Sequence, residues 1–173
     1  EGLAGVEYIN LPLFDDLSPA ALARVDAQQT HPLVPFYIAA LDTRGAAVCR
    51  ILTHIARVQE GAVLFNCTAG KDRTGIIAAL LLGLAEVSDE DIIDDYVLTE
   101  QMIPDLVVEF LSISRENGGD VESYATLLES PADTMAKMLS HIRVEYGSVE
   151  DYLVRIGLEQ RDLHRLIDQL CKD

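Results

Sequence analysis

The chain has 173 residues, of which 49% are apolar and 24% are charged, and this length and mixture are typical of one globular domain. The composition excludes a disordered chain, a collagen-like repeat and a coiled coil, and the length suffices to fold without disulfides or a structural metal. The 13 basic and 29 acidic residues give a net charge of −16, which repels nucleic acid and anionic lipid at long range. An anionic substrate must therefore be held by a local positive site.

The three cysteines, Cys49, Cys67 and Cys171, are too few for a disulfide framework, so free thiols are expected, as in a reducing compartment. The longest apolar run, residues 76–82, is too short to span a bilayer, and no secretion signal is present. Because the sequence begins at Glu1 rather than at a methionine, the localisation stays open between the cytoplasm and a secreted effector.

The first half of the chain predicts two strands and two helices. Residues 6–11 alternate well enough for a strand, and a Ser-Pro pair predicts the start of a short helix over residues 18–28. Apolar residues at helical spacing predict a helix over residues 36–59, which a glycine in its middle weakens or divides. The apolar run 62–65 indicates a strand buried on both faces.

The second half of the chain is helical throughout. Ser88, followed by three acidic residues, is a good N-cap and begins a helix. A proline at position 104 is expected to interrupt that helix. Helices are expected over residues 76–85, 88–115, 130–147, 148–157 and 160–170. Strands before residue 66 and helices after it predict an α/β domain with a helical C-terminal half.

The segment between the second predicted strand and the next helix contains the residues with chemical function. A loop in this position directs backbone N–H groups into one concavity, and the helix N-terminus adds positive potential. Gly70 permits the close approach or positive φ that such a cradle needs, and Arg73 offers a planar fork for two phosphate oxygens. Cys67 lies at the floor of this field, which lowers a thiol pKa. Together these residues predict a phosphate site with a nucleophile beneath it.

The chemistry expected of this site is phosphoryl transfer. Attack of Cys67 on phosphorus would give a phosphocysteine that water hydrolyses, while Arg73 and the loop amides stabilise the equatorial oxygens. A carboxylic acid must protonate the leaving oxygen. A Cys-x5-Arg spacing alone is a weak signal, but the preceding strand, the glycines and the following helix make it specific. The alternative, a buried structural cysteine in a tight turn, does not explain why Lys71, Asp72 and Arg73 occur together.

The run Cys-Thr-Ala-Gly-Lys-Asp-Arg-Thr-Gly over residues 67–75 resembles the signature of the cysteine-dependent tyrosine phosphatases. Its Gly-Lys-Asp-Arg-Thr core is typical of a bacterial branch, that of mycobacterial tyrosine phosphatase B and the atypical lipid phosphatases. Residues 11–15, 95–99 and 146–158 are similar to further segments of the family. The resemblance implies one phosphatase domain over residues 1–173, with a central sheet flanked by helices and a helical lid at residues 101–128. The N-terminal stretch that family members usually carry has no counterpart in this sequence.

The resemblance also implies an activity and a set of residues. The activity is hydrolysis of phosphotyrosine, extended to phosphoserine, phosphothreonine and phosphoinositides, without a metal or organic cofactor. The loop residues implied to contact the substrate phosphate are Thr68, Ala69, Gly70, Lys71, Asp72, Arg73 and Thr74. The ammonium of Lys71 is expected to bind a second phosphate, as in phosphoinositides, or else to neutralise Asp72.

The general acid has two candidates in this family resemblance, Asp72 within the loop and Asp15 near the N-terminus. Asp72 is preferred because it is one residue from Arg73 and must lie near the phosphate. The sequence departs from the family at Asn66, where a histidine is usual, and this departure predicts a higher pKa of Cys67 than is usual in the family.

Other classes of protein fit these features less well. The acidic clusters are explained by helix starts and helix faces, and the four histidines show no metal-ligand spacing, so no metal site is expected. A phosphate-binding pseudophosphatase, a lipid-only phosphoinositide phosphatase and a rhodanese-like sulfur carrier stay open as alternatives. The partner expected is a phosphoprotein or phosphoinositide substrate rather than nucleic acid. The oligomeric state is not predicted.

Overall fold

The computed structural model describes residues 5–14 and 31–171 of the chain. Helices account for most of these residues, and neither range contains a β-strand. The α/β fold with a central sheet that the sequence predicts is therefore wrong for the described part of the chain, which is predominantly helical. The helix expected over residues 18–28, and Asp15 with it, lies outside the described residues.

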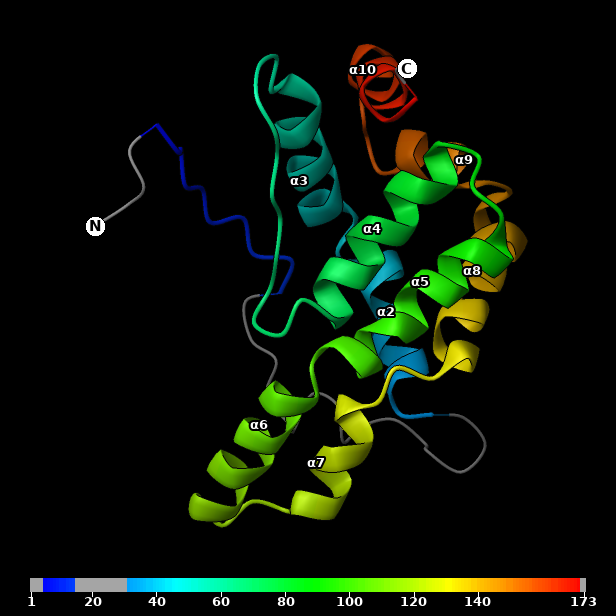
Figure 1. Cartoon of the computed structure of the whole chain (residues 1–173). Helices are drawn as coiled ribbons and strands as arrows, with labels where there is room; N and C mark the ends of the chain where they lie inside the picture. The colour runs from blue at the N-terminus through cyan, green and yellow to red at the C-terminus, as the bar shows by residue number, and fades with distance from the viewer. Residues whose placement is uncertain (1–4, 15–30, 172–173) are drawn as a thin grey trace.

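The two segments expected to be strands are extended but have no strand partner in the described ranges. They run along the same side of the helical body, as the blue and teal traces in Figure 1 show. Tyr8 is 87% exposed and Leu64 is 92% exposed, so the run 62–65 is not buried on both faces as its composition predicts. An apolar run predicts burial only when other chain segments cover both of its faces, and the described residues provide no such cover.

The helices lie close to the positions that the sequence predicts, with two divisions. Those before the signature loop are α2 (Leu33–Thr43) and α3 (Gly45–Arg57), and those after it are α4 (Asp72–Leu84), α5 (Asp89–Met102), α6 (Pro104–Glu116), α7 (Val121–Leu128), α8 (Ala132–Tyr146), α9 (Val149–Arg155) and α10 (Gln160–Leu170). The helix expected over 36–59 is divided before Gly45, where a Cβ atom would lie 2.7 Å from Ile156. The helix expected over 88–115 is divided at Pro104, which cannot donate a backbone hydrogen bond within a helix.

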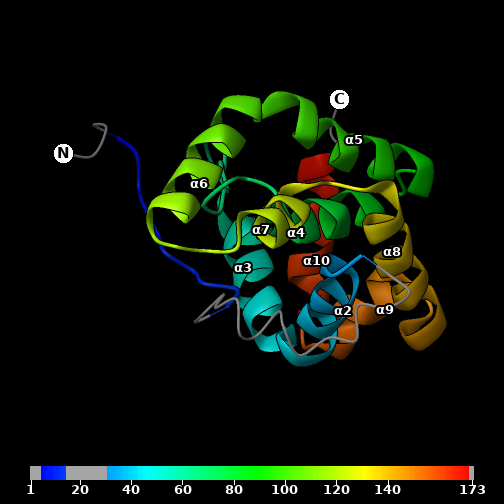
Figure 2. The ribbon, with the colours of Figure 1, turned by 90° about the horizontal axis from the view of Figure 1, so that it is seen from below.

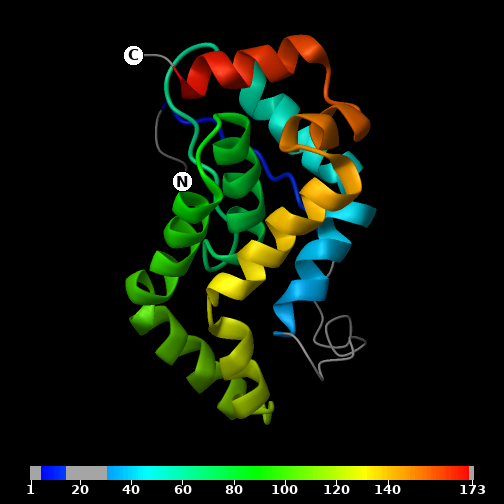
Figure 3. The ribbon, with the colours of Figure 1, turned by 90° about the vertical axis from the view of Figure 1, so that its right-hand side faces the viewer.

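Helix α4 lies inside the helical body and provides much of its core. Six of its residues are buried, including Ile76 and Leu80, each 0% exposed, and it packs against α5, α9 and α10. The apolar run of its sequence covers all sides of the helix, as expected for a helix surrounded by others. Figure 3 shows α4 between α5 and the layer that α2 and α3 form. The burial of α4 fixes the position of its N-terminus, where the signature loop ends.

Helices α6 and α7 form a hairpin that projects from this body. They pack against each other, and no residue of α6 is buried. Figure 1 shows the hairpin below the N-terminal end of α4, and the view from below places α7 over that end. The hairpin occupies the part of the chain, 101–128, for which a lid is expected, and its closure over the loop stays a prediction. No helix within the described ranges combines the length and the apolar character needed to cross a membrane.

Candidate active site

The signature loop runs from an extended segment into the first turn of α4. Gly70 has a φ of +68°, a left-handed conformation that favours glycine, and it turns the loop toward the helix. The Gly75 N–H donates to the carbonyl oxygen of Lys71 over 2.6 Å, which closes the first turn. The backbone N–H groups at this end of α4 have no partner within the helix, so they are available to the groups that face them.

The Cys67 side chain is half-buried and lies beside these donors. Burial raises the pKa of its thiol, but hydrogen bonds from the side chain and the backbone N–H of Thr74, the charge of Arg73 and the N–H of Lys71 outweigh burial, so the pKa of Cys67 is lowered. The Thr74 hydroxyl oxygen also accepts from the Cys67 N–H over 2.9 Å. The first turn of α4 therefore stabilises the thiolate, which is the nucleophilic form.

Asn66 does not contribute a charge to this environment. Its side chain is exposed, and its amide nitrogen donates to the carbonyl oxygen of Cys67 over 2.9 Å. The pKa of Cys67 is lowered although Asn66 occupies the position where the family has a histidine. The donors that lower this pKa come from the residues that follow Cys67 in the loop, not from the residue that precedes it.

Arg73 is half-buried and lies across the loop. Its Nη2 atom donates to the hydroxyl oxygen of Thr68 over 2.8 Å, which brings the guanidinium group to the beginning of the loop. The structure thus places Cys67, Thr68, Arg73 and Thr74 together at the N-terminal end of α4. A guanidinium group held in this way presents a planar pair of donors to a tetrahedral anion.

Asp72 is the first residue of α4, and its carboxylate is held from two sides. Oδ1 lies 2.7 Å from Nζ of Lys71 and 3.0 Å from the hydroxyl oxygen of Tyr37. The Tyr37 hydroxyl is also 3.0 Å from that of Tyr96, and burial raises the pKa of Tyr37 well above its ordinary value, so Tyr37 stays a neutral donor. Oδ2 of Asp72 has no hydrogen-bond partner within the described residues. No sequence pattern points to Tyr37, and Tyr96 is marked only as part of the segment 95–99 that resembles the family, because each reaches the site through tertiary packing.

Lys71 pairs with Asp72, which is the second of the two roles that the sequence leaves open for its ammonium group. Its side chain is 1% exposed, and Nζ lies 2.7 Å from Asp72 Oδ1, 3.1 Å from the carbonyl oxygen of Leu127 and 2.9 Å from that of Glu129. An ammonium group has three donors, and these three oxygens accept all of them. The structure therefore does not present Lys71 as a free charge for a second phosphate.

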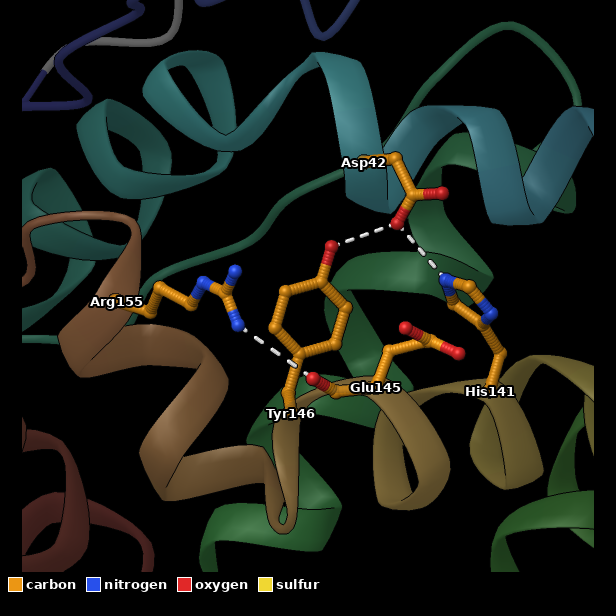
Figure 4. A pocket seen from close by; sticks show the side chains of 5 residues that line it. All are labelled: Asp42, His141, Glu145, Tyr146 and Arg155. Atoms are coloured by element: carbon orange, nitrogen blue, oxygen red, sulfur yellow. Dashed lines mark hydrogen bonds and ion pairs between the residues drawn. The ribbon is translucent and has the colours of Figure 1, made fainter.

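Two of the cavities in the described part of the molecule lie at the signature loop and at the junction of α2, α8 and α9. One of about 80 Å³ is beside the loop, between α4 and α5, and Gly70, Thr74 and Tyr96 contribute to its lining. The larger, of about 180 Å³, lies where α2, α8 and α9 meet (Figure 4) and is lined by Asp42, His141, Glu145, Tyr146 and Arg155.

The larger cavity contains polar groups that bond to each other. Asp42 Oδ1 accepts from the Tyr146 hydroxyl over 2.6 Å and lies 2.8 Å from Nε2 of His141, as the dashed lines in Figure 4 show. Arg155 lies over the Tyr146 ring. No residue of the signature loop lines this cavity, so its bonds join α2 to α8 and take no part in the site around Cys67. Within residues 5–14 and 31–171, no three His, Cys, Asp or Glu residues lie close enough to hold a metal ion.

Comparison with known proteins identifies the family. A model of the tyrosine phosphatase family matches residues 1–172, and the chain belongs to that family. The chain is 33% identical over 122 residues to a tyrosine-protein phosphatase of Nostoc commune, which covers 68% of this chain and 42% of the relative. It is 28% identical over 131 residues to the triple specificity protein phosphatase PtpB of Mycobacterium tuberculosis, which covers 69% of this chain and 47% of the relative. The resemblance that the signature residues indicate is thereby confirmed, and the chain spans less than half the length of these relatives.

Proposed function

We propose that this chain carries the catalytic site of a protein-tyrosine phosphatase and hydrolyses phosphate monoesters through a phosphocysteine. The observation that supports this proposal most directly is the environment of the Cys67 thiol. Donors of Thr74 and Lys71 and the charge of Arg73 lower its pKa together. Donors and charge that stabilise a thiolate at this place also attract the oxygens of a phosphate ester above it.

The first chemical step follows from this arrangement. The Cys67 thiolate attacks phosphorus, an S–P bond forms, and the P–O bond to the leaving group breaks with its electron pair passing to the leaving oxygen. Arg73 and the N–H groups of the loop hold the three equatorial oxygens while the transition state forms. Water then attacks phosphorus, the S–P bond breaks, and inorganic phosphate leaves with the thiolate restored.

Asp72 is the residue that we propose as the proton donor to the leaving oxygen. Tyr37 and Lys71 hold its Oδ1, whereas its Oδ2 is without a partner among the described residues and is free to carry a proton toward the substrate. In the second step the same oxygen would accept a proton from the attacking water. Asp15 stays the alternative donor, and it lies outside the described residues.

Phosphotyrosine in proteins is the substrate that we propose first, with phosphoserine and phosphothreonine second. The printed name of the mycobacterial relative, triple specificity protein phosphatase, supports a range wider than phosphotyrosine. Phosphoinositides follow after these, because the argument for them relies on a free lysine in the loop, and the ammonium of Lys71 is enclosed.

The experiment that tests the proposal measures phosphate release from phosphotyrosine, phosphoserine and phosphothreonine peptides and from mono- and bis-phosphorylated inositol lipids. Cys67→Ser removes the nucleophile, and Cys49→Ser is the matched control because Cys49 is also a half-buried free cysteine. We expect turnover of the phosphotyrosine peptide that Cys67→Ser abolishes and Cys49→Ser leaves unchanged.

Three other outcomes would change the conclusion. Turnover of lipids alone would replace the protein phosphatase with a phosphoinositide phosphatase. Phosphate that binds without any turnover would indicate a phosphate-binding pseudophosphatase. Equal turnover by Cys67→Ser and the unaltered chain would contradict the phosphocysteine mechanism.

A further inference from the structure

The C-terminal end of α7 is bonded to two side chains from other parts of the chain. The last carbonyl oxygens of a helix have no partner within it, and the helix dipole favours cations there. Lys71 Nζ donates to the carbonyl oxygens of Leu127 and Glu129. His31, which precedes α2, is the second of these side chains. Its Nε2 atom lies 3.1 Å from the carbonyl oxygen of Thr126 and 3.5 Å from the Glu129 carboxylate.

His31 is a donor in this contact. Its Nδ1 atom accepts from the Leu33 N–H over 3.3 Å, so Nε2 is the ring nitrogen that donates to the carbonyl oxygen of Thr126. His31 and Lys71 therefore both donate hydrogen bonds to carbonyl oxygens at the end of α7, but only Lys71 belongs to the signature loop. Among the described residues, the Lys71 contact is the one hydrogen-bonded link between the hairpin and the site around Cys67.

The contacts of Lys71 matter because, among the described residues, few others hold the hairpin: His31, and the apolar side chains of Leu127 and Leu128 at the end of α7. No residue of α6 is buried, and Leu128 is the one buried residue of α7. A segment with few buried apolar contacts opens locally at low free energy, so its polar contacts decide its position. Lys71 is 1% exposed and bonds to both α7 and Asp72, so the hairpin and the loop share one side chain.

We propose that Lys71 is a positioning residue that couples the phosphate loop to the α6–α7 hairpin. The inference rests on the proposed function, in which the loop binds a phosphate. A phosphate bound by the loop amides restricts the backbone from Cys67 to Arg73, and Lys71 lies within that segment. The restricted side chain then holds the carbonyl oxygens of Leu127 and Glu129. Because coupling is reciprocal, a fixed hairpin in turn favours the loop conformation that binds phosphate.

Hydrogen exchange of the full chain, measured with and without inorganic phosphate, tests this coupling. In the unaltered protein we expect phosphate to slow exchange in residues 67–75 and also in residues 121–129. In Lys71→Met we expect exchange of 121–129 to rise about tenfold without phosphate, since hydrogen bonds from a charged group are lost. Phosphate should still slow exchange of 67–75 in this variant, but not that of 121–129.

Two control variants separate coupling from simple anchoring. His31→Ala removes a contact to α7 that does not involve the loop, so exchange of 121–129 should rise while phosphate still slows it. Lys137→Met removes a half-exposed lysine that pairs with Asp133 on the surface of α8, and it should change neither segment. If circular dichroism shows that Lys71→Met is unfolded, Lys71→Gln replaces it, because glutamine keeps a donor at this position.

The outcomes distinguish this inference from the proposed function. Slowed exchange of 121–129 by phosphate in folded Lys71→Met would overturn the coupling, because the link would not need the lysine. Loss of protection in 67–75 as well would also overturn it, since Lys71 would then be part of the phosphate site itself. If phosphate slows neither segment of the unaltered protein, the proposed phosphate site fails. If phosphate slows only 67–75 there, the coupling fails alone.

Discussion

Helices α4 and α6 are equal in length, 13 residues each, but differ in what holds them. α4 buries six residues, whereas α6 buries none and packs against α7. Burial fixes α4 and with it the signature loop, while among the described residues the hairpin is held by two leucines and a few polar contacts at the end of α7. The comparison shows that a rigid scaffold and a weakly held segment meet at the same site, with Lys71 between them.

The first turns of the two helices give the largest contrast, because each contains one aspartate, Asp72 in α4 and Asp105 in α6. If Asp72 is the general acid, Asp72→Asn should lower kcat about 10²–10⁴-fold for esters with poor leaving groups. The loss should be smaller for good leaving groups, which need no proton. The measurement is a series of aryl phosphates of graded leaving-group pKa.

Asp105→Asn is the control for this series, since Asp105 is exposed and belongs to the hairpin. Its kcat should stay within a factor of two of that of the unaltered chain, the scale of a surface substitution. An equal loss across all leaving groups in Asp72→Asn would argue against Asp72, and Asp15→Asn would then be tested in the same series.

The second largest difference between α4 and α6 is expected in the free energy of unfolding that a truncated apolar side chain costs. Leu80 of α4 is 0% exposed and Val108 of α6 is 69% exposed. Leu80→Ala should lower the free energy of unfolding by about 3 kcal/mol, because it leaves a cavity. Val108→Ala should lower it by less than about 0.5 kcal/mol. Urea unfolding followed by circular dichroism measures both, and similar losses would show that the hairpin is as tightly held as the core.

The pKa of the Cys67 thiol reports on the hydrogen-bond donors at the N-terminal end of α4. Burial raises its pKa, and the hydrogen bonds of Thr74 are the strongest of the effects that lower it. Alkylation of Cys67 by iodoacetamide should therefore reach half its maximal rate at a pH below that of an ordinary cysteine. Thr74→Ala should raise this midpoint by about one pH unit.

Thr53→Ala is the matched control for this titration, because the Thr53 hydroxyl lies 4.0 Å from the sulfur of another cysteine, Cys49. It should leave the Cys67 midpoint unchanged, as mass spectrometry of the alkylated peptides would show. A midpoint for Cys67 that Thr74→Ala does not move would mean that the first turn of α4 does not control the thiol.

The smallest effect on stability is expected at Asp42, whose surface contact joins α2 to α8. Burial raises the pKa of Asp42, but hydrogen bonds with Tyr146 and His141 outweigh it, so the folded-state pKa lies below the unfolded value. The contact therefore stabilises the fold above pH about 4 and is lost as the pH falls through the folded-state pKa. Because the Asp42 side chain is 40% exposed, the effect should stay below about 1 kcal/mol.

Urea unfolding of the unaltered chain and of Asp42→Asn at pH 7 and pH 3 measures this contribution. The difference between the two proteins should be present at pH 7 and smaller at pH 3. A difference that is the same at both values would show that the carboxylate charge does not contribute.

The local sequence predicts most of the helical boundaries but not the fold class. Ser88 caps α5 as expected, with its hydroxyl oxygen accepting from the Asp91 N–H over 3.2 Å, and Pro104 begins a new helix. Such signals act within one helical turn and can be recognised in any sequence. Alternation predicts the strand over residues 6–11 and an apolar run predicts the strand over 62–65. Neither pattern shows whether a partner strand is present, and the described residues provide none.

The site shows the same limit. The arrangement of Cys67, Arg73 and Thr74 within one loop is local, so the signature pattern points to it directly. The position of Lys71 depends on carbonyl oxygens 56 and 58 residues further along the chain. Backbone carbonyls carry no sequence signal, so no pattern could distinguish a lysine that binds phosphate from one that holds a helix end.

The exposed extended segments have a consequence for the protein in concentrated solution. Tyr8 and Leu64 are among the most exposed large apolar side chains of the molecule, and they lie on extended chain whose backbone donors and acceptors have no strand partner in the described ranges. Extended edges of this kind template pairing between molecules. The net charge of −16 keeps copies apart at low ionic strength. Added salt screens that repulsion, so the solubility of this chain should fall as the salt concentration rises, and Leu64→Lys should reduce the fall.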